Sequence, residues 1–464
     1  MDCINNFSLN WVSDTKIEIM QNLRSKFAKK KILIYGFAKS GLATLEFLKK
    51  IKSEIYCWDD NSFVRKCIKK KYLLNFKEKL TNNFIDFIVV SPGINIRECY
   101  LKNFLVKNKA KIITDLDIFY NFNKNNQIIS VTGTNGKSTT CKLLEVVFKK
   151  AGYKTHLVGN IGEPILSLKK LNTKTVIIVE VSSYQLEYTQ HFKSNHAAIL
   201  NISPDHMERH RTMENYINAK IKILKFQSFK DHSYLNLNNK FTKKIIDNFR
   251  KKHFFSKLYK VDRYKVKKIL KKIKNKYLLS QNNLENISFV LKIASNCRIR
   301  LDVILQALNK FKGLPHRQER LSLNNEIICI NDSKATNFES SSQSLKSYKN
   351  IFWIVGGLPK KGDKFFLNKF KKNIIKAYII GKSTIFFKKQ LRKKVNFVVV
   401  NNLKNAVLKV IEDLKQINSM NSLTKNKYTI LFSPAAASFD QFTNFEERGK
   451  KFKELIYKAR SSIY

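Results

Sequence analysis

Short apolar runs alternate with helix-like stretches through the first quarter of the chain. Four of the runs have the length of buried strands and end in polar or glycine-containing turns: residues 31–34, 54–58, 84–90 and 111–114. Between the first two, residues 44–50 carry apolar side chains at the spacing of a helix. Strand, helix and strand in this order form the βαβ unit of a doubly wound sheet. The pattern therefore predicts a Rossmann-like α/β domain over residues 1–122.

The same alternation continues through the rest of the chain. Apolar Ile128 and Ile129 precede a glycine-rich turn and a helix-like stretch, and residues 215–312 are mainly helical in pattern after a few short strands, up to a break at Gly313. Further strands are predicted at 175–179, 197–202, 326–330, 350–355, 377–380 and 428–432. We therefore expect an α/β protein of three domains: a Rossmann-like domain at 1–122, a central mononucleotide-binding domain with a phosphate loop at 123–313, and a second Rossmann-like domain at 314–464.

Composition narrows the class of protein. With 464 residues, 43% of them hydrophobic, the chain has material for several cores, and its length predicts two to four domains of roughly 100–200 residues. No apolar run approaches the roughly 20 residues of a membrane-spanning helix, and the first residues lack the apolar core of a signal peptide. Seven scattered cysteines, none in a CxxC pair, indicate neither a disulfide framework nor a zinc site. A cytoplasmic protein without membrane insertion is expected.

The formal charge of +53 is extreme and, taken alone, points to nucleic acid or an anionic membrane surface. A nucleic-acid site should concentrate its lysines and arginines in one stripe, with aromatic side chains for stacking. Here the lysines are spread over all three thirds of the chain, and the densest stretch, residues 240–276, also carries regularly spaced apolar residues. Solvated basic faces of a globular protein explain the charge best, so no dedicated nucleic-acid partner is expected.

The strongest chemical motif is the glycine-rich segment 130–140, SVTGTNGKSTT, between a predicted strand and a predicted helix. A strand, a turn and a helix start in this order present backbone N–H groups to a polyphosphate. We expect the amides of residues 134–137 to surround the β-phosphate, Lys137 to bridge the β- and γ-phosphates, and Ser138 to bind Mg²⁺. Val131 stands where the usual pattern has its first glycine, so the loop indicates a nucleoside triphosphate without naming the reaction.

Two predicted strands deliver polar side chains to the edge of the sheet where α/β proteins bind ligands. Glu180 follows one of them directly, in EVSSYQLE, and is the candidate ligand for the magnesium ion. The next strand ends in LNISPDHMERH, which contributes Asn201, Asp205 and His206. His206 could position a metal ion, a water molecule or a substrate carboxylate, and a structural role is the alternative.

The first predicted βα turn carries a degraded glycine fingerprint, because Gly36, Ala38 and Gly41 give GxAxxG. Asp59 ends the next strand at about the sequence distance expected for a ribose contact. A nicotinamide cofactor, another ligand with a diphosphate and a purely structural turn all fit so weak a motif.

Several other polar residues are ambiguous one at a time. Lys220, in ENYINAKIKIL, is most simply a solvent-facing lysine on a helix. Asn283, Asn286, Arg317 and Asp332 could each be a helix cap, a turn residue or a surface group. Their joint occurrence with the phosphate loop changes this interpretation.

The chain resembles the Mur ligases of peptidoglycan synthesis in a set of motifs that follow the family's order: GTNGKST, GNIG, EVSSYQLE, NISPDHMERH, NAK, GLPHR, NDSKATN, GG-x-x-K and SPAAASFDQFTNFEERG. The similarity runs from about residue 31 to about residue 455, and the last motif is typical of the member that adds D-glutamate. The resemblance implies an ATP-dependent, amide-bond-forming ligase with Mg²⁺ as cofactor and with UDP-N-acetylmuramoyl-L-alanine and D-glutamate as substrates. Its three domains would bind the UDP moiety, ATP and the incoming amino acid, and we expect a monomer.

The resemblance also implies roles for individual positions. The nucleotide is expected at Gly133, Thr134, Asn135, Gly136, Lys137, Ser138, Thr139, Asn283, Asn286, Arg317, Asp332 and Lys334. Metal binding is implied for Ser138, Glu180, His206 and Lys220, and catalysis for Lys137, His206 and Lys220. The UDP-linked substrate is expected at Lys39, Ser40, Asp59, Ser91, Gly93, Asn160 and Ser182, and D-glutamate at Thr336, Lys360, Ser438 and Phe445.

Lys220 falls on the family lysine that is carbamoylated, so the resemblance reverses its simple interpretation as a surface residue. A carbamoylated lysine resembles a carboxylate and can help to fix a second metal ion, which an ammonium group cannot do. Lys361 follows Lys360, so the D-glutamate position is uncertain by one residue. Three positions depart from the family: Asn282 replaces a histidine, Ala38 replaces a common glycine, and Asn61 stands where an arginine can contact the UDP moiety.

The implied reaction activates a carboxylate as an acyl phosphate, which an amine then attacks. Because residues of two domains take part, closure on ligand binding is expected. Two alternatives stay open at this point: another member of the same superfamily, such as a folylpolyglutamate synthase, and a basic NTPase that is stimulated by nucleic acid.

Overall fold

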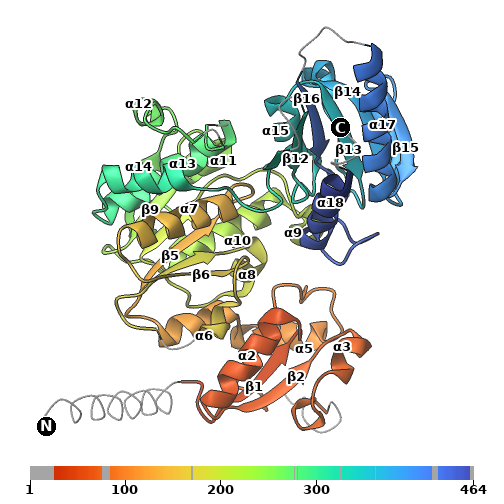
Figure 1. Ribbon diagram of the computed structural model, residues 1–464. Coiled ribbons are helices and arrows are strands. Elements are labelled where there is room, and N and C mark those ends of the chain that lie inside the picture. The colour runs from red at the N-terminus through yellow and green to blue at the C-terminus, as the bar shows by residue number, and fades with distance from the viewer. Residues whose placement is uncertain are drawn as a thin grey trace, which may run out of the picture. The chain divides into compact units, whose positions relative to one another are not determined.

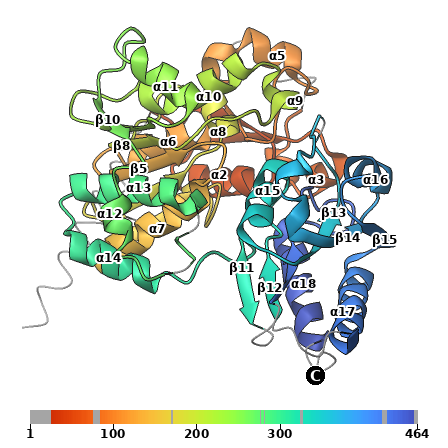
Figure 2. The same cartoon turned by 90° about the horizontal axis from the view of Figure 1, so that it is seen from above.

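The computed structural model describes residues 26–75, 84–168, 171–275, 277–279, 281–322, 327–360, 362–420 and 427–459. The chain divides into two compact units, residues 1–311 and 312–464. The first unit contains two parallel β-sheets and the second contains one mixed sheet (Figure 1, Figure 2). The expected α/β class with three sheets is confirmed, whereas the domain boundaries at 122 and 313 stay predictions. Within the described residues, no helix is both long enough and apolar enough to cross a lipid bilayer.

The N-terminal sheet has the strand order β2-β1-β3-β4, and all of its strands are parallel. The strands are β1 (Lys31–Tyr35), β2 (Glu54–Trp58), β3 (Phe87–Val90) and β4 (Ile112–Ile113), and the helices are α2 (Lys39–Lys50), α3 (Ser62–Lys66), α5 (Lys102–Lys107) and α6 (Asp115–Phe122). Each strand coincides with a predicted run, and β1 extends one residue beyond it, to Tyr35. Helix α2 begins earlier than the predicted stretch, because its first turn carries the polar and small residues KSG, which hide the apolar periodicity.

The central sheet has the strand order β10-β9-β8-β5-β7-β6 and is parallel throughout. Its strands are β5 (Gln127–Thr132), β6 (Thr155–Gly159), β7 (Val176–Glu180), β8 (His196–Ile199), β9 (His232–Asn236) and β10 (Lys257–Val261). The helices are α7 (Lys137–Lys150), α8 (Ser183–Tyr188), α9 (Met207–His210), α10 (Met213–Lys225), α11 (Lys240–Asp247), α12 (Lys267–Leu270), α13 (Gln281–Asn296) and α14 (Leu301–Lys310). Helix α7 packs on α13 and α14, while α10 packs on α8, β5 and β8.

One hydrophobic core joins the two sheets of the first unit. Buried side chains of β1 and α2 belong to the same cluster as buried side chains of β5, β7 and β8. A polar contact adds to this core: Oδ1 of Asp117, in the first turn of α6, accepts hydrogen bonds from Thr189 Oγ1 and from the backbone N–H groups of residues 190–192, at 2.7–3.1 Å. Such shared close packing explains why the N-terminal and central sheets form a single unit.

The sheet of the second unit has the order β11-β12-β16-β13-β14-β15, and of its described strands β11 alone is antiparallel. The strands are β11 (Glu319–Ser322), β12 (Ile327–Asn331), β13 (Ile351–Gly356), β14 (Ile374–Ile380), β15 (Phe397–Asn401) and β16 (Tyr428–Phe432). The helices are α15 (Phe338–Ser347), α16 (Thr384–Leu391), α17 (Leu403–Met420) and α18 (Phe445–Ala459).

Strand β13 shows how helices cover both faces of this sheet. Its residues Trp353 and Val355 pack with α15 and α16, whereas Phe352 and Ile354 pack with α17 and α18. Alternate side chains of a strand point to opposite faces, so both faces are buried, as a doubly wound fold requires. Strands β11 and β15 are not among the predicted strands.

Candidate active site

The glycine-rich loop lies between β5 and the N-terminus of α7, as predicted. Gly136 precedes the helix with a left-handed φ of 84°, a conformation that favours glycine. A Cβ atom on Gly136 would lie 2.3 Å from Oδ1 of Asn286 on α13, so a side chain does not fit there. The same Asn286 oxygen accepts a hydrogen bond from Thr140 Oγ1 at 3.2 Å. Helix α13 therefore supports the loop and the first turn of α7.

Two lysines converge on the carbonyl oxygen of Gly133. Nζ of Lys137 lies 2.9 Å from this oxygen and 2.9 Å from that of Thr134, and Nζ of Lys220, on α10, lies 2.9 Å from the Gly133 oxygen. Lys220 is only 1% exposed. Burial, together with the charge of Lys137, lowers the pKa of Lys220 well below its ordinary value. The simplest interpretation of Lys220, a solvent-facing lysine, is therefore wrong.

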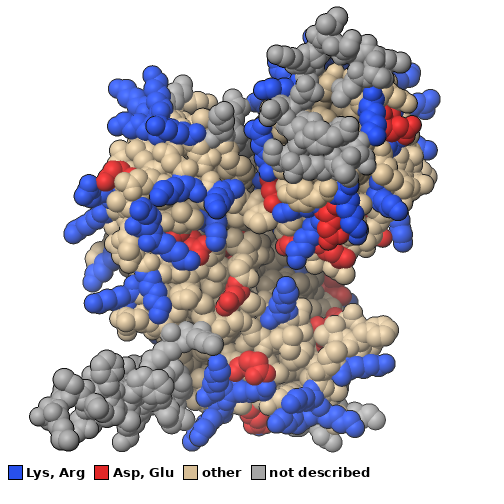
Figure 3. Space-filling model, viewed as in Figure 1, with Lys and Arg blue, Asp and Glu red and all other residues tan. Residues whose placement is uncertain are grey.

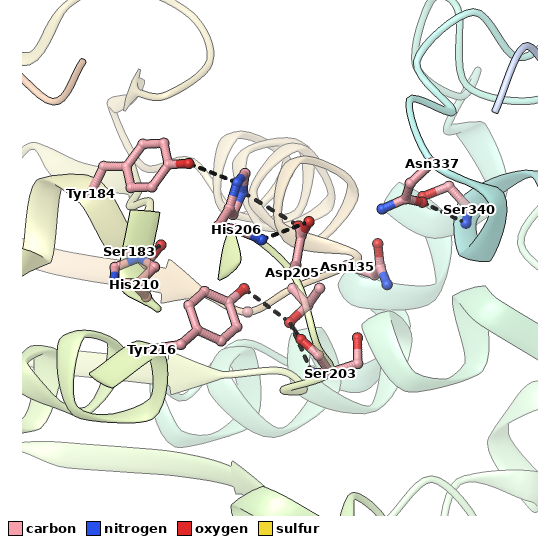
Figure 4. A network of polar contacts seen from close by, with 12 residues as sticks. Asn135, Ser183, Tyr184, Ser203, Asp205, His206, His210, Tyr216, Asn337 and Ser340 are labelled. Atoms are coloured by element: carbon pink, nitrogen blue, oxygen red, sulfur yellow. Dashed lines mark hydrogen bonds and ion pairs between the residues drawn. The ribbon is translucent and has the colours of Figure 1, made fainter. Parts of the chain in front are cut away.

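Residues of α10 and of the segment after β8 anchor the loop (Figure 4). Thr134 Oγ1 lies 3.1 Å from the Tyr216 hydroxyl and accepts a hydrogen bond from the Ser203 backbone N–H at 3.0 Å. Asn201 accepts the backbone N–H of Thr134 on its carbonyl oxygen and that of Asn135 on its side-chain oxygen, at 3.0 and 2.8 Å. Asn201 therefore binds two of the four amides of residues 134–137 in this structure, and the contact of these amides with a phosphate stays a prediction.

The segment after β8 brings His206 to the carboxyl ends of the central strands. His206 has a left-handed φ of 58° just before α9, and its Nδ1 lies 2.8 Å from the Tyr184 hydroxyl (Figure 4). Oδ2 of Asp205 lies 3.3 Å from His206 Nε2. Protein groups on both ring nitrogens orient the imidazole. His210, one helical turn later, bonds to the Ser183 hydroxyl at 3.0 Å, and burial lowers the pKa of His210 to about 4.

Glu180 ends β7 and is 1% exposed. Its Oε1 accepts a hydrogen bond from Asn160 Nδ2 at 3.0 Å, whereas its Oε2 is buried without a hydrogen-bond partner among the described residues. Oγ1 of Thr132, at the end of neighbouring β5, is a second buried oxygen of this kind. A cation that prefers oxygen ligands would satisfy Glu180 Oε2. The residues present therefore fit a magnesium ion at this strand edge.

Protein ligands alone do not form a complete metal cage. In the part of the chain that the structure describes, no three His, Cys, Asp or Glu side chains converge as a metal site. Mg²⁺ in nucleotide-binding sites takes one or two carboxylates and completes its shell with phosphate oxygens and water. A site built on Glu180 agrees with that chemistry. Ser138 and His206 stay predicted ligands, and protein groups contact both ring nitrogens of His206 in this structure.

The two asparagines predicted on the nucleotide side lie on α13 and are both buried. Nδ2 of Asn286 donates to Oδ1 of Asn283 at 3.2 Å, and Nδ2 of Asn283 donates to the Tyr277 carbonyl oxygen at 2.8 Å. The structure places Asn286 against Gly136 and thus brings it to the phosphate loop. Direct contact of either residue with a nucleotide stays a prediction, and the Asn282 side chain lies outside the described residues.

In the N-terminal domain, protein contacts shape the turn after β1. Gly36 has a left-handed φ of 92°, and its carbonyl oxygen accepts a hydrogen bond from Ser91 Oγ at 2.6 Å. The Asp59 carboxylate accepts the backbone N–H groups of Phe37 and Asn61 at 2.7 and 2.9 Å. Ser91 and Asp59 therefore hold the turn, and their substrate contacts stay predictions. The other positions expected near this substrate lie on separate segments: Lys39 and Ser40 in the first turn of α2, Gly93 after β3, Asn160 after β6 and Ser182 at the N-cap of α8.

Asp332 follows β12 in the second unit and is buried. Its carboxylate accepts hydrogen bonds from the Ser344 and Ser433 hydroxyls, at 2.7 and 2.9 Å, and from the Gln318 backbone N–H at 3.2 Å. Burial raises the pKa of Asp332 to about 6. Arg317 lies in the turn before β11. Asp332 thus ties several segments of this unit together, and its role toward a nucleotide stays a prediction.

The residues expected near D-glutamate lie on three segments that follow neighbouring strands: Thr336 after β12, Lys360 after β13, and Ser438 after β16, with Phe445 as the first residue of α18. Leu358 and Ala437 exchange two backbone hydrogen bonds of 2.9 Å, which joins the second loop to the third. Ser333 Oγ donates to the Phe445 carbonyl oxygen at 2.9 Å, and Lys334 Nζ lies 3.6 Å from the centre of the Phe445 ring. Lys361, the alternative to Lys360, lies outside the described residues.

Sequence reasoning missed several residues that hold these sites together. Tyr216 and Tyr184 contact Thr134 and His206. Arg209 is buried and donates to the Ile94 carbonyl oxygen of the N-terminal domain at 2.6 Å. Each lies inside or next to a motif quoted above. Their contacts join residues that are far apart in the sequence, so no local sequence pattern indicates their roles.

Known proteins resemble this chain in sequence and in fold. A family model described as the Mur ligase middle domain matches residues 131–299. The UDP-N-acetylmuramoylalanine–D-glutamate ligase of Rickettsia bellii (strain RML369-C) is 33% identical over 92% of this chain and 97% of that protein. The ligase of the same name from Clostridioides difficile (strain 630) is 32% identical over 92% and 98%. Among solved structures, the MurF ligase of Thermotoga maritima in complex with ADP has a TM-score of 0.54 and 14% identity, and the match covers 82% of this chain and 90% of that one.

The chain belongs to the Mur ligase family, whose members are ATP-dependent ligases that form amide bonds. The two relatives described above match over nearly the whole chain, and both carry the name UDP-N-acetylmuramoylalanine–D-glutamate ligase. The family and the reaction class predicted from the motifs are thereby confirmed.

Proposed function

We propose that this chain joins D-glutamate to UDP-N-acetylmuramoyl-L-alanine with the conversion of ATP to ADP and phosphate. The observation that carries the proposal is the convergence of Lys137 and Lys220 on the phosphate loop, one strand away from a buried carboxylate with a free oxygen, Glu180. This arrangement suits a transferring phosphoryl group and a metal ion. The names of the relatives and the closing motif SPAAASFDQFTNFEERG favour D-glutamate as the amine.

The phosphate loop would hold the triphosphate. Lys137 would turn from the loop carbonyl oxygens to the β- and γ-phosphates, and the amides at the N-terminus of α7 would face the same oxygens. Glu180, Ser138 and His206 would hold Mg²⁺. The bound ion would supply positive charge that offsets the charge on the γ-phosphoryl group. Because the site's own dipoles and charges are fixed in advance, little reorganisation is needed during transfer.

The chemistry has two steps. The carboxylate oxygen of the L-alanine residue attacks the γ-phosphorus of ATP. The bond between the γ-phosphorus and the β–γ bridging oxygen breaks, so that ADP departs and an acyl phosphate forms. The D-glutamate nitrogen then attacks the acyl carbon. As the C–N bond forms, the C–O bond to phosphate breaks and the amine loses a proton. We assign the amine to the loops that carry Thr336, Lys360, Ser438 and Phe445.

Lys220 would act as a carbamate. A neutral amine adds to CO₂ with loss of one proton, whereas an ammonium group does not react. Burial and the charge of Lys137 favour the neutral amine of Lys220 in the folded protein. The carbamate would replace a buried neutral amine next to Lys137 with an anion that can bind a metal ion.

Release of ADP under different substrate combinations tests the proposal. With purified protein, ATP and Mg²⁺, we expect ADP to accumulate only when UDP-N-acetylmuramoyl-L-alanine and D-glutamate are both present. L-Lysine and diaminopimelate serve as matched amine controls and should give the background rate. Turnover with either of these amines, or with a folate substrate and L-glutamate, would contradict the assignment.

A further inference from the structure

Arg448, in the first turn of α18, is buried where the three loops of the second unit meet, and it is only 1% exposed. Its Nε donates to Ser333 Oγ at 3.1 Å, and its Nη2 donates to the carbonyl oxygens of Ser333 and Ala436 at 2.8 and 3.0 Å. Nη1 lies 3.3 Å from the place that a Cβ atom of Gly357 would take. One guanidinium group therefore bonds to the loops after β12 and β16 and lies beside Gly357, the first residue after β13.

The helix that carries Arg448 is itself firmly placed. A Cβ atom on Gly449 would lie 2.3 Å from Nδ1 of His316, so α18 packs on the His316 ring more closely than any other residue type allows. On the same helix, the Phe452 ring lies 4.6 Å from the Phe432 ring at the end of β16. Because such a helix cannot shift easily, the guanidinium group holds a fixed position beside the loops.

The charge of Arg448 is not neutralised at close range. Among the residues that the structure describes, no carboxylate forms an ion pair with it, and Asp440 is the acidic group whose charge acts on it. Burial lowers the pKa of Arg448 to about 10, so it remains a cation at neutral pH. A buried cation without a paired carboxylate costs stability, and proteins keep such groups where they serve a ligand.

We propose that Arg448 is a positioning residue for the amino-acid substrate: its planar group fixes the three loops as one surface, and its charge favours a dicarboxylate on that surface. The inference rests on the proposed function, because D-glutamate is the substrate expected at these loops. Arginine suits the role because two nitrogens of its planar group act together: Nε donates to the Ser333 hydroxyl, while Nη2 donates to the carbonyl oxygens of Ser333 and Ala436. The single nitrogen of a lysine cannot take both positions.

Steady-state kinetics of Arg448→Lys and Arg448→Met test the role. Arg448→Lys keeps the charge and loses the fork, so the KM for D-glutamate should rise about tenfold while the KM values for ATP and the UDP-linked substrate stay within about twofold. Arg448→Met loses both and should raise the KM for D-glutamate about 100-fold. The matched control is Lys451→Met, which removes one charge from an exposed position of the same helix and should behave as wild type.

Ser333→Ala provides a second route should Arg448→Met fail to fold. It removes the hydroxyl that accepts from Arg448 and donates to Phe445, and it should give an intermediate rise in the KM for D-glutamate. Two results for Arg448→Lys would overturn the inference. One is a lower kcat with an unchanged KM for D-glutamate, and the other is an equal change in the KM values for all three substrates. If wild-type protein itself shows no D-glutamate-dependent ADP release, the proposed function fails, and that result is distinct because it appears before any variant is made.

Discussion

A carboxylate oxygen that is buried without a hydrogen-bond partner costs the folded protein free energy, and Oε2 of Glu180 is such an atom among the described residues. Glu180→Gln keeps the shape and removes the charge. In metal-free protein we expect the free energy of unfolding to rise by about 1 kcal/mol, because a neutral amide is cheaper to bury than an anion. At the same time kcat should fall about 100-fold, and the Mg²⁺ concentration for half-maximal rate should rise.

Urea unfolding without metal and a Mg²⁺ titration of the rate measure the two effects separately. Glu214→Gln is the matched control, because it makes the same change at an exposed position of α10. A variant that lost stability and activity together, as expected for a residue that only supports the fold, would contradict a metal-binding role for Glu180.

His196 is a buried residue with a structural role at the opposite ends of the central strands. Nε2 of His196 accepts a hydrogen bond from the Gln127 amide at 3.1 Å, and Nδ1 lies 2.9 Å from the Tyr234 hydroxyl. An amide nitrogen can only donate, so a proton on Nε2 would oppose another donor. Burial and the neighbouring His232 lower the pKa of His196 to about 4.

The low pKa of His196 predicts a loss of stability in acid. Above the unfolded pKa of about 6.5 both states are neutral; as the pH falls from there toward about 4, the unfolded state alone takes up the proton. Between pH 7 and pH 5 this group should cost about 2 kcal/mol of unfolding free energy. Urea unfolding of wild type and His196→Gln at both pH values isolates the effect. Between pH 7 and pH 5, the unfolding free energy of the variant should fall by about 2 kcal/mol less than that of wild type. Equal losses in the two proteins would contradict the prediction.

At the scale of elements, the glycines at the two ends of α7 make it possible to distinguish the effect of backbone strain from an effect on the phosphate loop. Gly136 and Gly152 both have left-handed φ angles, 84° and 88°, but a Cβ atom on Gly136 would collide with Asn286 whereas one on Gly152 would meet nothing within 4 Å. The left-handed φ alone should make alanine cost about 1 kcal/mol of unfolding free energy at either position, and the collision should add to that cost at Gly136. Only Gly136→Ala should also displace the phosphate loop and weaken ATP binding. We expect the affinity to fall at least about tenfold, which corresponds to about 1.4 kcal/mol of binding free energy.

Thermal unfolding and calorimetric titration with ATP distinguish these two variants. The result that would contradict the role of Gly136 is an unchanged ATP affinity in a folded Gly136→Ala protein. A comparable loss of affinity in Gly152→Ala would show that strain anywhere at the ends of α7 suffices, and the collision with Asn286 would then explain nothing.

The sequence predicts those elements whose signal is local. The predicted strands, the phosphate loop and Glu180 follow from residues that are adjacent in the chain, and the structure contains each of them. Strands β6, β11 and β15 escaped prediction. The contacts that complete the sites join distant residues: Thr134 and Tyr216 are 82 positions apart, and Arg448 and Ser333 are 115 apart. No periodicity encodes such pairs. The same holds for Asn201, which takes two loop amides that local reasoning assigns to a phosphate.

At the scale of the whole molecule, the charge of +53 is spread over the surface. On the face that Figure 3 shows, lysines and arginines (blue) are scattered, with acidic residues (red) between them, and they do not form one stripe. Three basic side chains are instead buried within the described chain: Lys220 at the phosphate loop, Arg209 between the two domains of the first unit, and Arg448 in the second unit. The other lysines and arginines of the described residues are at least partly exposed.

This distribution predicts that nucleic acid binds without controlling ATP turnover. Any protein this basic should bind single-stranded RNA at about 50 mM salt and release most of it near about 200 mM, because the contacts are counterion exchanges with phosphate. Because the basic residues are spread along the whole sequence, RNA should leave the rate of ADP release unchanged when D-glutamate is absent. Parallel measurements of RNA binding and ADP release at both salt concentrations check this. RNA-dependent ADP release that survives the higher salt would instead favour the nucleic-acid-stimulated NTPase, because electrostatic attraction alone is then too weak to explain it.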